Sequence, residues 1–221
     1  MLNIRKFFRD ETGSLSIEAL LCFPLVSWCL AASLVFWDAY YAKSINMRAA
    51  YTIGDMISRE TGEMDDAYME GMNDVLNFIM KGRYESRMRV TVITPDMTDA
   101  EFAAVSKIED MKYSVEWSYA SEGFNGQLTN ASLVNFEGQL PYLAKGDVAI
   151  MVETNVGYTP FFDVGLGNLL FADLTVTRPR ISPQLKYKAP DGTVYEADGD
   201  PDSLSDDGLS PIDDPDLDPE V

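Results

Sequence analysis

The sequence predicts an α+β fold, in which a long N-terminal transmembrane and amphipathic helix packs on a small antiparallel sheet. Near the N-terminus, Ala19–Trp37 is an uncharged run of 19 residues. The middle of the chain contains segments that alternate apolar and polar residues, and the last 33 residues contain acidic but no basic side chains. We expect a basic leader at residues 1–13, a transmembrane helix at 14–41, an external α+β domain at 42–188 and a disordered acidic tail at 189–221.

The uncharged run is long enough to cross a bilayer as a helix. At 1.5 Å per residue its 19 residues span about 28 Å, close to the ~30 Å hydrocarbon core. Arg5, Lys6 and Arg9 precede the run, and Trp37 and Tyr40 lie at its other end, where an aromatic belt is expected. Because basic residues favour the cytoplasmic side, we expect a single-pass protein with its N-terminus inside the cell.

Two amphipathic helices are predicted after the membrane run. The first continues from it, since Ile45, Ala49, Ile53 and Met56 recur at helical spacing, and Gly62 would end it. The second is expected to begin near Asp65 and Asp66, whose charges suit a first turn, and to end at Gly82. Its inward face would carry Tyr68, Met72, Val75, Leu76 and Ile79. We interpret the methionines between positions 47 and 80 as core filling rather than a metal-binding stripe.

Four later segments alternate with a period of two and predict strands of an antiparallel sheet with one buried face. They are centred on Val90, Trp117, Ile150 and the pair Leu174 and Val176. The stretch from residue 96 to 107 is open to two interpretations, a loop or a short helix. Thr98 and Glu101 resemble a capping box, which favours the helix.

Composition argues against most enzymes and against nucleic-acid binding. The chain has 36 acidic and 17 basic residues, a formal net charge of -19 and no histidine. A charge of this sign repels phosphate backbones, and the lack of histidine removes the usual general base and nucleophile partner. Cys22 and Cys29 share one face of the predicted membrane helix, where we expect them to pack as small apolar residues. We therefore expect no enzyme activity and no cofactor.

The acidic tail is predicted to be disordered because it lacks apolar residues to bury. Its 33 residues contain 12 acids and five prolines. Asp198, Asp200 and Asp202 resemble the start of an EF-hand loop, but Ser203 and Leu209 replace the glycine and glutamate that such a loop needs. These aspartates are weak calcium candidates, and a solvated tail is the favoured interpretation.

Three kinds of processing can be considered for the N-terminus. A signal peptidase could cut after the small residues at 31–33, although the apolar run is longer than the usual signal core and continues past that point. A lipoprotein signal would need small residues just before a cysteine, but Leu21 precedes Cys22 and Trp28 precedes Cys29, so this interpretation fails. Without leader cleavage, Glu18 is an ordinary interfacial carboxylate near a helix N-terminus. The third interpretation is prepilin-like. Removal of the leader after Gly13 would give Ser14 a free α-amine one helical turn from Glu18, and this carboxylate could pair with the α-amine of a neighbouring subunit.

The segment GSLSIEALLCFPLV resembles the N-terminal region of prepilins, and more specifically it is similar to TadE/TadG-like pseudopilins of the tight-adherence, or Flp-type, pilus system. Later segments are also similar to that family. They are Leu140-Pro141, Gly146-Asp147, Val152-Glu153, Tyr158-Thr159-Pro160 and Arg178-Pro179-Arg180. The major Flp pilins place Tyr after the glutamate, whereas this chain has Ala19. The length of the chain likewise argues against the main fibre subunit.

The resemblance implies a pseudopilin or minor pilin that takes part in pilus assembly and adhesion. It implies cleavage after Gly13 by a prepilin peptidase and an assembly role for Glu18. The implied partners are other pilins and pseudopilins, the inner-membrane assembly platform and the membrane itself. The implied location is the bacterial inner membrane with the domain in the periplasm, or a surface pilus after incorporation. The alternative is a permanently anchored periplasmic binding module with no pilus role.

Overall fold

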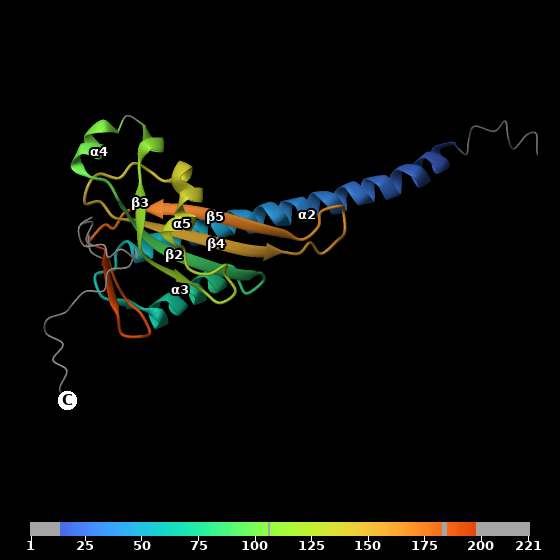
Figure 1. The fold of residues 1–221 in the computed structure, drawn as a ribbon. Coiled ribbons are helices and arrows are strands. Elements are labelled where there is room, and N and C mark those ends of the chain that lie inside the picture. Colours follow the sequence, from blue (N-terminus) through green and yellow to red (C-terminus); the bar gives the residue numbers. More distant parts are fainter. Residues whose placement is uncertain (1–13, 106, 183–184, 198–221) are drawn as a thin grey trace, which may run out of the picture.

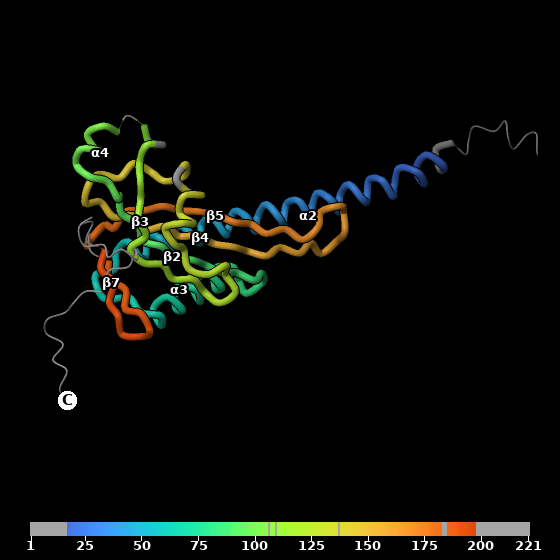
Figure 2. The backbone as a smooth tube through the Cα atoms, in the orientation of Figure 1, coloured from blue at the N-terminus to red at the C-terminus, as the bar shows by residue number. Residues whose placement is uncertain are grey.

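The computed structural model describes residues 14–105, 107–182 and 185–197. It shows an α+β fold, in which a long N-terminal helix packs on a four-stranded antiparallel sheet (Figure 1). The backbone trace in Figure 2 shows the first part of this helix projecting away from the domain.

Helix α2 (Ser14–Ile57) is continuous over 44 residues. Pro24 lies within it and has no N–H to donate to the preceding turn. The helix ends five residues before the expected stop at Gly62, where the Glu60 carboxylate accepts the backbone N–H groups of Thr61 and Gly62. Its predicted inner face is confirmed at Ala49 and Ile53 but is wrong at the last position. Met56 is exposed, and Ile57, a full turn after Ile53, is buried instead.

Helix α3 (Asp66–Ile79) begins where the sequence predicts. Asp65 is its N-cap, and the Asp65 carboxylate accepts the backbone N–H of Tyr68 at 2.8 Å. Gly82 follows the helix in a left-handed conformation with φ 58° and donates its N–H to the carbonyl of Asn77. This geometry is a helix ending that glycine favours.

The main sheet has the strand order β3-β2-β4-β5, and all neighbouring pairs are antiparallel. Its strands are β2 (Glu85–Pro95), β3 (Tyr113–Ala120), β4 (Ala149–Tyr158) and β5 (Leu169–Thr177). The four predicted strand segments therefore form one sheet, with β2 and β4 at its centre.

The expectation of one buried face per strand is wrong for β2, β3 and β4, which are buried on both faces over most of their length. On the face opposite to α2, Thr91 and Met151 are buried. The reason is a second covering layer, which the alternating pattern alone does not reveal. The layer consists of α4 (Asp99–Ala104), η2 (Ile108–Asp110), α5 (Asn130–Leu133) and η3 (Val134–Gln139). The helix interpretation of the Asp96–Lys107 stretch is confirmed, because α4 has the capping box of Thr98 and Glu101.

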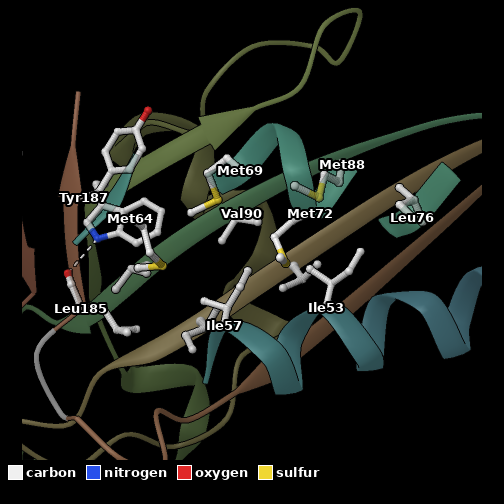
Figure 3. Close-up of a cluster of buried hydrophobic side chains, with 14 of the residues drawn as sticks. Ile53, Ile57, Met64, Met69, Met72, Leu76, Met88, Val90, Leu185 and Tyr187 are labelled. Atoms are coloured by element: carbon white, nitrogen blue, oxygen red, sulfur yellow. Dashed lines mark hydrogen bonds between the residues drawn. The ribbon is translucent and has the colours of Figure 1, made fainter. Parts of the chain in front are cut away.

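The main hydrophobic core lies between the sheet and helices α2 and α3 (Figure 3). Ile53 and Ile57 contribute from α2, and Met69, Met72 and Leu76 contribute from α3. The methionines buried between positions 47 and 80 are Met64, Met69, Met72 and Met80. Core filling is thus confirmed for these four side chains, whereas Met47 and Met56 are exposed.

A small second sheet corrects the expected start of the disordered tail. It consists of β1 (Met64–Asp65), β6 (Leu185–Lys188) and β7 (Val194–Ala197), in the order β1-β6-β7. The Trp117 indole donates to the Leu185 carbonyl at 3.2 Å and stacks on Tyr187. Residues 189–197 belong to the folded domain because this hairpin covers the end of the core, with Ala197 fully buried. Residues 198–221 lie outside the described part of the chain.

We predict that Gly54→Leu destabilises the protein whereas Gly71→Leu does not. A Cβ at Gly54 would lie 3.4 Å from Thr177 Cγ2, so a longer side chain would push α2 off the sheet, whereas a Cβ at Gly71 meets no atom within 4 Å. Overpacking costs about 1–3 kcal/mol. Thermal unfolding of the full-length chain in detergent measures both effects, and equal melting temperatures for the two variants would contradict this packing.

We also predict that β7 stabilises the domain. A chain ending at Lys188 loses β7 and uncovers Leu185 and Tyr187, and burying one such side chain is worth about 1.5–3 kcal/mol. The control ends at Ala197 and keeps β7. A lower melting temperature is expected for the shorter chain relative to the control, and identical values would show that β7 adds nothing.

Candidate functional site

The first part of α2 projects from the domain as a helical segment, residues 14–30, which we call the arm (Figure 2). Every residue from Ile17 to Leu30 is exposed. The large apolar side chains among them are Ile17, Leu20, Leu21, Phe23, Leu25, Val26, Trp28 and Leu30. A helix that is apolar on all sides needs lipid or other protein around it. This arm is part of a helix long and apolar enough to cross a membrane, and it is the one such helix in the described residues.

Two of the three predicted assembly residues lie at the start of this arm. Ser14 is the first residue of α2, and Glu18 lies four residues later with an exposed side chain. Four residues correspond to about 6 Å along a helix axis. Glu18 is the one charged residue of the arm. Gly13 lies outside the described residues, so the structure does not place the expected cleavage point.

At the other end of the apolar run, a polar junction joins α2 to the sheet. The Tyr158 hydroxyl lies 3.2 Å from both the Asp38 carboxylate and the Val35 carbonyl. Arg83 forms a salt bridge with Asp38 at 3.1 Å. Asp38 is buried, and a buried carboxylate is tolerated only with such partners. We call Asp38, Arg83 and Tyr158 the junction.

Burial and charge both favour the neutral phenol at the junction. Burial, followed by the nearby Asp38 carboxylate, raises the pKa of Tyr158 to about 12. The same two causes raise the pKa of Tyr84, whose ring lies 5.9 Å from that of Tyr158. Tyr158 therefore stays protonated and able to donate to Asp38 at any physiological pH.

Further polar contacts hold α2 along the sheet. Asn46 donates to the Asp173 carboxylate at 2.7 Å, on β5. Asp55 pairs with Arg180 at 3.0 Å, and the Arg180 backbone N–H donates to the Ser58 carbonyl at 2.7 Å. These contacts lie successively further along α2 from the junction. The arm is thus an extension of a helix that is fixed to the domain over its second half.

A buried ion pair crosses the central strands on the opposite face of the sheet. Arg89 Nε and Nη2 donate to the two Glu153 carboxylate oxygens at 2.6 and 2.8 Å. Arg89 also donates to the Gly126 carbonyl and lies over the Phe124 ring. Because both charges are paired and enclosed, we assign this pair to the architecture of the domain.

In the part of the chain that the structure describes, no three His, Cys, Asp or Glu side chains lie close enough together to bind a metal ion. The weak calcium candidates Asp198, Asp200 and Asp202 lie outside that part. Cys22 and Cys29 are free thiols, exposed on the arm. Seven residues separate them by about 10 Å along one helix, too far for a disulfide within the chain.

A cleft of about 560 Å³ opens beside the junction. Asp38, Arg83 and Tyr158 line it, together with Glu85 and Phe161. Its walls combine two carboxylates, one guanidinium and aromatic rings, which can contact a polar group.

Sequence reasoning missed the junction and the pairings along α2. One signal was present, because Asp38 directly follows the apolar run and needs a partner if it is covered. Two of these partners lie in segments that are similar in sequence to the pseudopilins, because Tyr158 bonds to Asp38 and Arg180 pairs with Asp55. Two other residues of those segments form pairs elsewhere in the domain, Glu153 with Arg89 and Arg178 with Asp147.

No family model, curated protein or solved structure matches this chain.

We predict that Tyr158→Phe weakens the junction. The variant loses a hydrogen bond to a charged group, worth about 1.5–3 kcal/mol. Because the folded state holds the Tyr158 pKa near 12, above the ordinary value of 10.0, this stability is present below pH 10 and is lost as the pH rises towards 12. Melting curves of the full-length protein should therefore fall more steeply above pH 10 for the wild type than for the variant.

Tyr84→Phe is the matched control. The Tyr84 hydroxyl is buried and forms no hydrogen bond within the described residues, so its removal should not destabilise the protein at neutral pH. Equal losses in the two variants would contradict a specific bond between Tyr158 and Asp38.

Proposed function

We propose that this protein is a pseudopilin or minor pilin that takes part in assembly of a tight-adherence type IV pilus. The observation that carries the proposal is the arm, a helix exposed and apolar on all sides with one charged residue. Such a surface can be stored in a bilayer and later covered by the same surface of neighbouring subunits. The domain would then lie outside the inner membrane and contact other subunits.

Glu18 gives this packing a register. A carboxylate at the edge of the hydrocarbon is stable only with water or a partner of opposite charge. After cleavage at Gly13, each subunit would supply one such partner, the α-amine of Ser14. In a staggered array, the amine of one subunit would meet the carboxylate of the next. A neighbouring subunit shifted out of this register would leave both charges unpaired, which costs free energy.

The fixed second half of α2 supports the same proposal. Because Asp38, Asn46 and Asp55 tie the helix to the domain, the position of the arm determines the position of the domain. Packing of arms would thus arrange the domains without a flexible linker between them.

A permanently anchored periplasmic binding module is the second candidate, and the cleft at the junction favours it. In that case the helix would serve only as an anchor. Neither cleavage after Gly13 nor the charge of Glu18 would then matter, and this difference separates the two functions.

We predict that the mature chain begins at Ser14 in cells with a working prepilin peptidase. Gly13→Ala should block cutting but leave membrane insertion intact, because the apolar run is unchanged. Mass spectrometry of the purified protein measures the N-terminus. Gly71→Ala is the control, since no neighbouring atom opposes a Cβ there. An intact Met1 start in the wild type, or a start near Leu34, would rule out prepilin processing.

We predict that Glu18→Ala sharply lowers surface pili while the domain keeps its melting temperature. The neighbouring α-amine would lose its partner, and an uncompensated buried charge costs about 3–5 kcal/mol. Glu63→Gln is the control, because Glu63 is exposed on the domain. Piliation is counted by electron microscopy of both strains. Normal piliation with Glu18→Ala would favour the anchored module.

A further inference from the structure

We propose that the loop between β4 and β5, residues 159–168, inserts into the headgroup layer of the membrane that α2 crosses. This contact would hold the domain in one orientation on the bilayer surface. The inference rests on membrane anchoring by α2, which both candidate functions share, and not on pilus assembly.

Strand β4 leads the chain towards the membrane. Its residue Val152 lies near Gly54 of α2, because a Cβ on Gly54 would be 3.8 Å from Val152 Cγ2. Its last residue, Tyr158, reaches Asp38, sixteen residues closer to the N-terminus of the helix. The strand therefore runs antiparallel to α2 and ends where the apolar run ends. Figure 1 shows the loop continuing in the same direction.

The loop lies at the end of the apolar run, where two residues of that run are buried. Ala32 and Val35 are buried although they belong to that run. Ala32 lies about 9 Å from Asp38 along the helix, on the membrane side. Leu166 of the loop packs against the cluster of Ala39, Ala42 and Tyr158, which lies directly after the end of the run. If Asp38 marks the edge of the hydrocarbon, the loop overlaps the depth of 5–10 Å at which interfacial segments bind.

The loop carries the side chains that such a depth favours. Phe161 and Phe162 are adjacent and more than half exposed, and their ring centroids are 5.0 Å apart. Exposed aromatic rings are stabilised at the boundary between headgroups and acyl chains. The one charge of the loop is Asp163, whose carboxylate accepts the Gly165 N–H at 3.1 Å. An interfacial position leaves the rest of that carboxylate in water.

Charge near the junction is mixed, because Asp38 and Glu85 line the cleft together with Arg83. Lys81 and Arg83, in the turn between α3 and β2, are exposed, and Arg83 is bonded to Asp38 at the end of the apolar run. This basic turn contrasts with a chain whose formal net charge is -19. Anionic headgroups attract basic side chains by about 1 kcal/mol each. The choice of lipid as the occupant therefore rests on the exposed aromatic rings, and Arg83, which lines the same cleft as Phe161, adds one cation near them.

A spin label tests the depth of the loop in the full-length protein. Cys22→Ser and Cys29→Ser first remove the native thiols, and Phe162→Cys then carries the nitroxide. The protein is reconstituted at high dilution in vesicles of phosphatidylethanolamine and phosphatidylglycerol, with a water-soluble nickel chelate on both sides of the membrane. Power saturation compares relaxation by oxygen, which concentrates in lipid, with relaxation by the chelate. Phe161→Cys provides a second label site in the same loop.

Ile181→Cys is the matched control, an exposed apolar position next to Arg180. Arg180 contacts Asp55, about 26 Å beyond Asp38 along the helix, far from the bilayer. We expect the oxygen-to-nickel ratio to be several-fold higher at the two loop positions than at the control. Equal ratios would overturn the proposal. Labels shielded from both reagents would also overturn it, by showing that protein covers the loop. None of these relaxation measurements depends on leader cleavage.

Discussion

Close packing of the second half of α2 on the sheet is the constraint on which the rest of the structure depends. The face of the helix that meets the sheet is built largely from small residues, including Ala42, Ala49 and Gly54, so the backbone can lie near β4 and β5. Apolar burial alone would permit sliding along this smooth face. Asp38, Asn46 and Asp55 remove that freedom, because each bonds to a residue at a fixed place on the sheet or directly beside it. The arm therefore projects from the domain in a defined direction.

The two carboxylates that flank the long apolar run of α2, Glu18 and Asp38, have different surroundings. Asp38 is enclosed by Arg83 and Tyr158 and is satisfied within the chain, whereas Glu18 is exposed, with no covering residue from the domain. A carboxylate enclosed by partners of its own chain is held within the subunit, whereas an exposed one on the arm is accessible to a second subunit. This asymmetry connects the architecture with the proposed assembly role.

The sequence predicted the elements better than their surroundings. Helical spacing and the first-turn acids Asp65 and Asp66 located α2 and α3, and period-two alternation located all four strands of the main sheet. Alternation did not reveal the second layer over Met151, since buried polar residues such as Thr91 look like a solvent face. The acidic composition placed Val194–Ala197 in the predicted disordered tail. Tyr195 and Ala197 belong to a strand of only four residues, which is too short for its alternation to be recognised in the sequence. The junction depends on contacts between residues about 120 apart, which no local pattern contains.

The pairing of Glu18 with the α-amine of a neighbouring subunit is tested most directly by zero-length cross-linking. Isotopically labelled and unlabelled subunits are mixed in one membrane and treated with a membrane-permeant carbodiimide, which joins a carboxylate to an amine in contact. The Lys112–Glu101 pair, 2.8 Å apart within the domain, serves as the internal positive control. We expect an amide between Ser14 of one isotope and Glu18 of the other. Cross-linking of the control pair without that amide, or an amide only within single chains, would contradict intersubunit pairing.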